Sequence, residues 1–286
     1  MIRRVTSYSS STKSAMNRLS RDNDIFQEIV RLREVNEDFS IATVIAVKGS
    51  SSGRVGDRAI FSEDGKRLMG WIGAGCVENR VGKTATETLV EGKPRIVTID
   101  LNGDTMRSGI PCGGRMSILV EPQLKTPVIL IRGMGRVAET LSELGNLLDF
   151  RVVVQVPEEE ESRYSGCHKI MTGPLELDEV DFQIDYLVLL THHRDDDSVS
   201  LQALEMGIRF VAVMASEKKT NLIIEYLKAH GVSPEDLNRL HAPAGLDLNA
   251  KSAEEIALSI MAEIVLHRNG GTGSPLNRMV REDTVR

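Results

Sequence analysis

The sequence predicts an α/β protein in which a mixed α/β domain is followed by a Rossmann-like parallel-sheet domain. The second half alternates short, all-apolar strand segments with helical segments, the pattern of a parallel sheet covered by helices on both faces. It also carries the motif Gly133-x-Gly135-x-x-Ala138 directly between an apolar strand and a helix, the context that a dinucleotide-binding turn requires. A length of 286 residues fits two domains.

In the first half, apolar spacing and turn signals define each element. Asn23-Asp24 can cap a helix over residues 25–35, and the apolar run that follows predicts a strand over 39–48. The turn Glu63-Asp64-Gly65 separates two strand-like runs and so predicts a hairpin. We expect the hairpin strands over 58–62 and 67–72, a helix over 77–90, strands over 95–101 and 115–121, and a polar loop over 102–114.

The second half begins after the segment 122–127, which has a proline at each end and is interpreted as a linker. We expect strands over 128–131, 150–156, 186–190 and 209–214, and helices from the glycine motif to about 148 and over 197–206, 218–230 and 253–267. The resulting division is a flexible leader over 1–21, a first domain over 22–124, a Rossmann-like domain over 125–268 and a mobile tail over 269–286.

Composition excludes several classes of protein. Apolar residues make up 41% of the chain and charged residues 27%, as in ordinary globular proteins. The longest apolar run, 210–215, is far shorter than the ~20 residues of a membrane-spanning helix, so no membrane span is expected. A net charge of −6 and an aromatic content of 4% argue against a nucleic-acid partner, because such proteins present basic and aromatic surfaces.

Cysteines stand in two unusual places. Cys76, after Gly73-Ala74-Gly75, falls at or near a helix start, where the helix dipole favours a thiolate. Cys112 precedes Gly113-Gly114 at the mouth of a strand. Each could be a small buried apolar residue, but two cysteines in glycine turns favour a soft-ligand or sulfur-handling site over zinc, since neither has a partner at ligand spacing. Cys167 is interpreted as structural, and an odd, low cysteine count suggests reduced thiols in the cytoplasm.

The glycine motif predicts a phosphate site at a helix N-terminus. Gly133 permits the tight turn, Gly135 lets backbone amides approach a phosphate, and Ala138 permits close packing of the helix on the strand. The acidic residue that would bind a ribose belongs at the end of the second strand, where only Glu158, after Val156-Pro157, is available. Productive NAD(P) binding and a scaffold with altered nucleotide binding both remain open.

Several polar residues have two interpretations each. His192 follows a strand and could contact a cofactor or a metal, whereas the acidic triplet 195–197 is expected to cap a helix and face solvent. His241 either lines a cleft or is a hydrogen-bonded loop histidine. The run 158–161 is expected to be a solvated loop. Trp71 and Met69 are expected in the core or at an interface.

Taken together, these motifs resemble the XdhC/CoxI family, accessory proteins for molybdenum hydroxylases such as xanthine dehydrogenase and carbon monoxide dehydrogenase. The resemblance covers about 39–267 and rests on Ala42-Thr43-Val44 with Gly49-Ser50-Ser51, Gly73-Ala74-Gly75-Cys76-Val77-Glu78, Cys112-Gly113-Gly114 with Glu121-Pro122, Gly133-Met134-Gly135-Arg136-Val137-Ala138, Thr191-His192, His241-Ala242-Pro243-Ala244-Gly245-Leu246-Asp247, Ser252-Ala253-Glu254-Glu255-Ile256-Ala257 and Ala262-Glu263-Ile264. The chain departs from the family pattern at Ser52-Gly53-Arg54-Val55, Arg136, Val156-Pro157 and Ala215-Ser216-Glu217.

The resemblance implies a maturation factor that binds molybdenum cofactor (molybdopterin), helps to sulfurate it and delivers it to a molybdenum hydroxylase apoenzyme. It also implies a cysteine desulfurase as partner and a homodimer. Molybdenum would be held only through the cofactor, with Cys76 and Cys112 as soft ligands or persulfide carriers. The implied cofactor-binding residues are Ser50, Ser51, Gly73, Gly75, Cys76, Glu78, Cys112, Gly113, Gly114, Gly133, Gly135, Arg136, Ala138 and His192.

Two other functions remain as alternatives. An NAD(P)-dependent oxidoreductase could be built on the Rossmann-like domain, but it should keep a ribose-binding acid at the end of the second strand. A docking module without a cofactor would have no need of Cys76 and Cys112 in glycine turns. For any of these functions, a site between the two domains is expected, because ligand sites favour domain interfaces.

Overall fold

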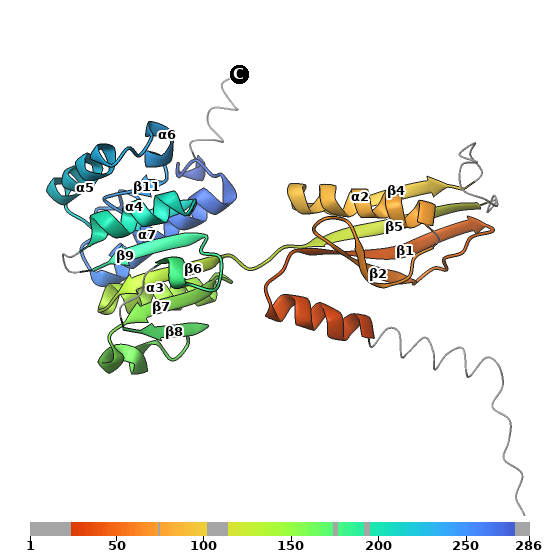
Figure 1. Cartoon of the computed structure of the whole chain (residues 1–286), viewed down its shortest axis with the longest axis horizontal. Helices are drawn as coiled ribbons and strands as arrows, with labels where there is room; N and C mark the ends of the chain where they lie inside the picture. Colours follow the sequence, from red (N-terminus) through yellow and green to blue (C-terminus); the bar gives the residue numbers. More distant parts are fainter. Residues whose placement is uncertain (1–23, 74, 102–113, 174–176, 192–194, 278–286) are drawn as a thin grey trace, which may run out of the picture. The chain divides into compact units, whose positions relative to one another are not determined.

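Two units make up the chain, Met1–Lys125 and Thr126–Arg286, and each has its own sheet and core (Figure 1). The computed structural model describes residues 24–73, 75–101, 114–173, 177–191 and 195–277. None of the helices within these ranges is long and apolar enough to cross a membrane. The predicted fold class is confirmed, since an antiparallel sheet with helices precedes a parallel sheet with helices.

The first unit is built on a five-stranded antiparallel sheet in the order β3-β2-β1-β5-β4. Strand β1 lies in the centre and carries a register shift between Val44 and Ala46, where it pairs with β5. The strands are β1 (Phe39–Gly49), β2 (Arg58–Ser62), β3 (Arg67–Gly70), β4 (Arg95–Asp100) and β5 (Gly114–Gln123).

Helices cover opposite faces of this sheet (Figure 1). Helix α2 (Gly75–Glu91) buries Val77, Val81 and Ala85 against the side chains that β1, β2 and β5 direct to one face. The helix of residues 24–34 buries Ile25 and Leu32 against the opposite face. This division follows from the two-residue period of a strand, because alternate residues of β1 point to alternate helices.

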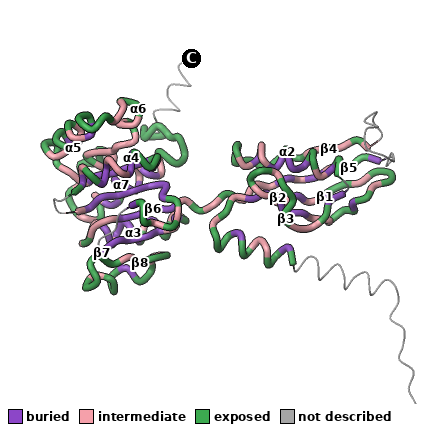
Figure 2. Tube along the Cα trace, viewed as in Figure 1, coloured by how far each residue is buried: buried purple, intermediate pink, exposed green. Residues whose placement is uncertain are grey.

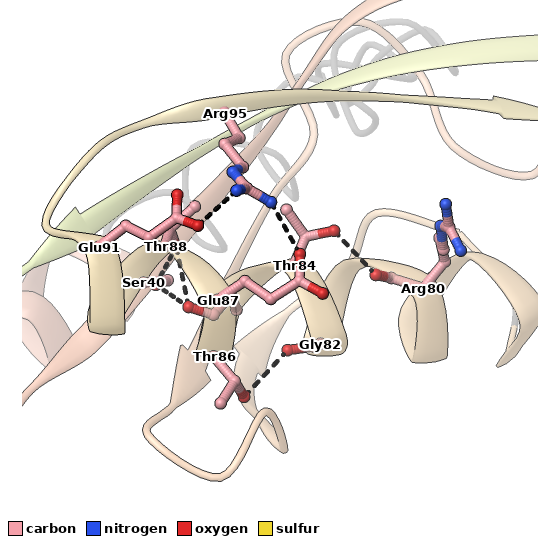
Figure 3. Close-up of polar contacts among 10 residues, drawn as sticks. Ser40, Arg80, Gly82, Thr84, Thr86, Glu87, Thr88, Glu91 and Arg95 are labelled. Carbon is pink, nitrogen blue, oxygen red and sulfur yellow. Dashed lines mark hydrogen bonds and ion pairs between the residues drawn. The ribbon is translucent and has the colours of Figure 1, made fainter.

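Polar contacts fix α2 against the edge of the sheet (Figure 3). Arg95, the first residue of β4, pairs with Glu87 at 2.9 Å and with Glu91 at 2.5 Å. The buried hydroxyl groups of Ser40 and Thr88 lie 3.3 Å apart, and Thr88 Oγ1 donates to the carbonyl oxygen of Ala85 at 2.8 Å. Exposed ion pairs stabilise little by themselves, so the apolar face and the satisfied hydroxyl groups hold the helix in place.

The second unit is built on a six-stranded parallel sheet in the order β11-β10-β9-β6-β7-β8. Numbered within the unit, this order is 6-5-4-1-2-3, which is the strand order of the dinucleotide-binding Rossmann fold. The chain reverses its direction of winding between β6 and β9, where ligands bind in such sheets. The strands are β6 (Val128–Gly133), β7 (Arg151–Val156), β8 (Lys169–Thr172), β9 (Tyr186–Leu190), β10 (Phe210–Val213) and β11 (Leu240–His241).

Helices cover both faces of this sheet, and the buried positions follow its strands (Figure 2). On one face, α3 (Arg136–Leu147) and α7 (Ala253–Asn269) pack against Ile129 and Ile131. On the other face, α4 (Asp196–Glu205) and α5 (Glu217–Ala229) pack against Leu130 and Leu187. Three short helical turns complete the unit, η1 (Glu158–Tyr164), η2 (Leu177–Glu179) and α6 (Pro234–Leu237).

The structure corrects two of the local predictions. The segment 158–161 is not a loop but the start of the 3-10 helix η1, which begins after Pro157 and buries Tyr164. The expected linker begins too early, because Pro122 still pairs with Ser40 in β1. The pairing of β5 with β4 does not extend beyond Val120. Proline has no amide proton to donate, but Pro122 has no partner in β4 and therefore loses no hydrogen bond to that strand.

Candidate functional site

In the first unit, three motif segments meet. Ser51 Oγ lies 3.1 Å from the sulfur of Met116, which joins the loop after β1 to β5. A β-carbon on Gly53 would lie only 2.5 Å from the carbonyl oxygen of Ile72, so the same loop packs against the segment that leads to Gly73. On Gly114, a β-carbon would collide with the carbonyl oxygen of Ser50. The structure therefore brings Ser50, Ser51, Gly73 and Gly114 together, whereas Cys112 and Gly113 lie outside the described residues.

Cys76 is the second residue of α2 and is exposed, which confirms its predicted place near a helix start. The amide groups of the first turn of a helix lack partners within the helix and favour negative charge, including that of a thiolate. The neighbouring Gly75 is exposed, and no described residue lies within 4 Å of the place where its β-carbon would be. Glu78 pairs with Arg67 at 3.0 Å, and this ion pair ties the first turn of α2 to β3.

Other predictions for apolar and sulfur residues have mixed outcomes. Met69 packs against the core under the helix of residues 24–34, as expected. Trp71 is 42% exposed, which excludes the core as its place, and its expected place at an interface stays a prediction. Cys167 packs against the core of the second unit, and burial raises the pKa of its thiol while a hydrogen bond with Ser142 opposes the shift.

In the second unit, the glycine turn joins β6 to α3. Gly133 has a φ of 136°, and a β-carbon there would lie 2.5 Å from the carbonyl oxygen of Leu190 in β9. Gly135 caps α3 with a φ of 96°, and nothing in the described part of the chain lies within 4 Å of its β-carbon position. Ala138 is fully buried. The first glycine is therefore required by packing, and the second keeps space open before a helix N-terminus, which suits an anion.

Charged side chains surround this turn. Arg136 Nε pairs with Glu254 at 2.8 Å, and Arg163 Nη1 pairs with Glu139 at 2.7 Å. The hydrogen bond from Arg163 lowers the pKa of Glu139. Tyr164, the last residue of η1, is buried. Its hydroxyl oxygen has no hydrogen-bond partner in the described part of the chain. Burial raises the pKa of Tyr164, and the nearby amide of Gly135 acts in the opposite direction.

A cavity of about 420 Å³ lies at the carboxyl ends of the central strands, on the reversal point of the sheet. This volume is within the ~300–1,000 Å³ typical of small-molecule sites. The cavity lies beside the glycine turn, and Glu158, the only acid that the sequence offered for a ribose, does not line it. Its lining residues are Arg132, Gly133, Met134, Gln155, Val156, Pro157, Gly173, Leu190 and Thr191.

Gln155 is a site residue that sequence reasoning missed. It is 7% exposed on β7, opposite Arg132 in the register of β6 and β7. Its Nε2 donates to the carbonyl oxygen of Gly173 at 2.7 Å, and its Oε1 has no hydrogen-bond partner within the described ranges. The sequence did contain a signal, since Gln155 is the polar residue within the run 152–156. Buried polar atoms are normally paired, so a polar residue at such a position calls for a partner.

The acidic triplet corrects another prediction. Asp195 stands at the N-cap position of α4 but forms no side-chain cap bond, and Asp196 is buried rather than solvated. The Asp196 carboxylate accepts a hydrogen bond from Thr191 and pairs with the ammonium group of Lys219 in the first turn of α5. A carboxylate this deeply buried requires such partners. His192, which was predicted to bind the cofactor, lies outside the described residues.

His241 is a hydrogen-bonded histidine at the end of β11 and does not line the cavity. Its Nδ1 lies 2.8 Å from Glu263 Oε1, and its ring stacks on Phe210 with 3.8 Å between ring centroids. Glu263 Oε2 also accepts a hydrogen bond from the amide of Gly245 at 2.7 Å. The pair therefore anchors the loop after β11 to α7.

Two family models match the chain in succession. The model described as the XdhC and CoxI family matches residues 32–100, and the model described as the XdhC Rossmann domain matches residues 129–264. The chain belongs to the XdhC/CoxI family. The two matches fall on the two units of the fold, with the Rossmann match spanning the parallel sheet from β6 to α7.

Among known proteins, this XdhC/CoxI chain is similar to two from Escherichia coli K12. YqeB, an uncharacterised protein, is 29% identical over 262 residues, which cover 87% of this chain and 47% of YqeB, so the chain spans about half the length of that relative. The molybdenum cofactor insertion chaperone PaoD is 22% identical, with 78% of this chain and 81% of PaoD covered. A xanthine dehydrogenase structure from Bacillus halodurans is similar at 20% identity and a TM-score of 0.45, covering 87% of this chain and 97% of that one.

The departures of this XdhC/CoxI chain from the family pattern have definite places in the structure. Val156 and Pro157 line the cavity beside Gln155, so an apolar surface replaces the acidic end of the second strand. Ser216 caps α5 by accepting a hydrogen bond from the amide of Lys219.

No group of three or more His, Cys, Asp or Glu side chains in the described ranges is arranged to hold a metal ion.

Proposed function

We propose that this XdhC/CoxI protein is an accessory protein of a molybdenum hydroxylase, which holds molybdenum cofactor and assists its insertion into the apoenzyme. Family membership supports this role, and so does the similarity to a molybdenum cofactor insertion chaperone. The structural observation that carries it is the exposed Cys76 thiol at the N-terminus of α2, beside the open position at Gly75.

The residues present suit such a cofactor. A thiolate is a soft ligand, so Cys76 in the first unit is our candidate donor to molybdenum, and Cys112 joins it on sequence grounds alone. In the second unit, the turn at Gly135, which is open among the described residues, suits a phosphate group. When bound, the cofactor supplies the redox-active molybdenum on which the hydroxylase depends.

The finer parts of this proposal concern sulfuration and partners. An exposed thiol can carry a persulfide, so in this proposal the Cys76 thiolate attacks the outer sulfur of a persulfide on a cysteine desulfurase, releases the desulfurase thiolate and holds that sulfur as its own persulfide. The partners proposed are the molybdenum hydroxylase apoenzyme, the desulfurase and a second copy of this chain, all in the cytoplasm. The chain is proposed to act as a maturation factor and not as an independent enzyme.

NAD(P) binding is the second candidate, because the strand order and the glycine turn are those of dinucleotide-binding proteins. The cavity argues against it. Where the second strand ends, Val156 and Pro157 provide no carboxylate for a ribose. A titration with both ligands separates these two functions.

The test uses the full chain under anaerobic conditions. We expect stoichiometric retention of molybdenum cofactor after gel filtration, and loss of retention in Cys76→Ser and in Cys112→Ser. Cys167→Ser is the matched control, because that thiol lies against the core of the second unit and should leave retention unchanged. Normal retention by both Cys76→Ser and Cys112→Ser would refute the thiolate role.

A further inference from the structure

We propose that the exposed indole of Trp71 is the platform on which the flat ring system of the cofactor held at Cys76 stacks, and that Arg67 holds this platform in place. This inference deepens the proposed function and rests on it for the identity of the ligand. Trp71 then selects for the ring of the cofactor, and Cys76 selects for its metal.

The backbone around Trp71 is fixed on both sides. The amide of Trp71 donates to the carbonyl oxygen of Arg58 in β2 at 2.7 Å, and the next residue, Ile72, is buried in the core beneath α2. Gly73 follows with a φ of 140°, and a β-carbon there would lie 3.2 Å from the β-carbon of Val77 in the first turn of α2. The indole nevertheless stays 42% exposed, so a firmly held turn presents it to solvent.

Arg67 links this indole to the first turn of α2. Its guanidinium carbon lies 5.8 Å from the centroid of the Trp71 ring, and its Nε pairs with Glu78 at 3.0 Å. Nη1 of the same side chain donates to the carbonyl oxygen of Gly70 at 2.7 Å. A planar guanidinium can contact an aromatic face and an anion at the same time. Trp71 is therefore held next to the turn of α2 that carries Cys76.

An exposed indole beside a thiol suits a ligand that combines a metal with a flat ring. In molybdenum cofactor, the ring system is covalently attached to the sulfur atoms that bind the metal, so a donor to the metal also brings the rings close. Aromatic side chains bind heterocyclic rings by offset stacking of the two π-faces. Leaving a large apolar side chain in water forfeits the free energy of its burial, which a stacked ring restores.

There is space for such a ring at the start of α2. Gly75 and Cys76 are small and exposed, and no described residue lies within 4 Å of the β-carbon position of Gly75. A residue without a side chain lets a flat group approach the backbone closely. The thiol, the open glycine and the indole thus offer a metal donor, a gap and a stacking surface within one short segment.

The experiment uses the full chain under anaerobic conditions with two ligands, molybdenum cofactor and tetrathiomolybdate, which offers molybdenum and sulfur without a ring. Trp71→Phe keeps an aromatic face, whereas Trp71→Leu keeps only apolar bulk. Phe26→Leu is the matched control, because the Phe26 ring is 53% exposed and also has an arginine, Arg58, 5.8 Å from its centroid. Phe26 belongs to the helix that covers the other face of the sheet from α2.

We expect Trp71→Leu to weaken the binding of molybdenum cofactor about tenfold, and Trp71→Phe and Phe26→Leu to stay within about threefold of the native chain, as for loss and retention of one stacked ring. Tetrathiomolybdate should bind the native chain and the variants equally. The chain contains one tryptophan, so its fluorescence reports on Trp71 alone. Molybdenum cofactor should shield this fluorescence from quenching by acrylamide.

Unchanged binding of molybdenum cofactor by Trp71→Leu would overturn the proposal. So would equal weakening for both ligands, because Trp71 would then support the thiol and not a ring. Unchanged acrylamide quenching in the cofactor-bound native chain would also overturn it and leave the indole free for a protein partner. Unfolding midpoints check that each variant folds. If Cys76→Ser loses molybdenum cofactor while Trp71→Leu binds it as the native chain does, this inference fails and the proposed function stands; if the native chain retains no cofactor, both fail.

Discussion

The ammonium group of Lys219, in the first turn of α5, forms an ion pair with the buried carboxylate of Asp196, in the first turn of α4. Asp196 is 3% exposed, and the side chain of Lys219 is 24% exposed. Removing one partner of a buried pair leaves an uncompensated charge, so Lys219→Met should destabilise the second unit by about 3 kcal/mol. Urea denaturation monitored by circular dichroism measures this change.

The neighbouring Lys218 is exposed and provides the matched control, with an expected change of less than about 0.5 kcal/mol for Lys218→Met. The double variant Asp196→Asn/Lys219→Met should recover part of the lost stability, because no charge is left buried. A loss in Lys219→Met no larger than that in Lys218→Met would contradict the structural role of the pair.

The two glycines of the β6–α3 turn should respond differently to alanine. Gly133→Ala combines an unfavourable φ with a collision at Leu190 and should cost about 3 kcal/mol or more. Gly135→Ala meets none of the described residues and should cost about 1–2 kcal/mol through its backbone conformation. Its added methyl group would fill the space before α3, so it should lose cofactor retention while remaining folded. Equal destabilisation by the two substitutions would show that packing on Leu190 is unimportant.

Cys76 should react with alkylating agents much faster than Cys167. The first thiol is exposed at a helix N-terminus, whereas the second is half-buried with a raised pKa. The thiolate is the reactive form, so at pH 7.5 we expect at least about a tenfold difference in the rate of iodoacetamide labelling. Peptide mass spectrometry resolves the two sites, and denatured protein gives the reference rate for each. Similar native rates would place the Cys76 thiol in a shielded environment and weaken its proposed role.

Acidification should destabilise the second unit in two steps. Burial, together with the charges of His241 and Arg209, lowers the pKa of His267, so the unfolded chain binds more protons and stability falls as the pH drops below the ordinary histidine value of 6.5. Burial raises the pKa of Glu263, but hydrogen bonds from His241 and the Gly245 amide outweigh it and leave the pKa lowered. Its contribution is present above 4.5 and is lost below that value.

His267→Phe tests the first step, because phenylalanine keeps the aromatic contacts with Tyr186 and Phe210 but does not titrate. The midpoint of urea unfolding should differ less between pH 7.5 and pH 5.5 in this variant than in the native chain. An unchanged pH dependence would show that His267 does not contribute to it.

Local signals were enough to predict most of the fold. The apolar runs that became β1, β6, β7 and β9 carried their own secondary structure, and the glycine motif marked the β6–α3 turn. The short strands β8 and β11 were missed, because four and two residues carry too little pattern and they depend on pairing with β7 and β10. Helix α6 had a usable signal in Ser233-Pro234, a cap followed by proline at the first helical position.

The candidate site was predicted less completely, for a physical reason. Cys76 and the glycine turn are local features, so their places followed from the sequence. The partner of Asp196 stands 23 residues further along the chain, and only the packing of α4 on α5 brings it near. Gln155 appeared to be an ordinary strand residue, because its place on the wall of the cavity and its bond to Gly173 depend on the tertiary structure.

The most direct test of the account is an anaerobic titration of the full chain with molybdenum cofactor, run beside NADH and NADPH. Family membership, the exposed Cys76 and the apolar end of the second strand predict stoichiometric retention of molybdenum cofactor, lost in Cys76→Ser, with no comparable binding of either nicotinamide nucleotide. Micromolar binding of NADH or NADPH, with no retention of molybdenum cofactor, would contradict the account and identify the chain as a nicotinamide-dependent protein.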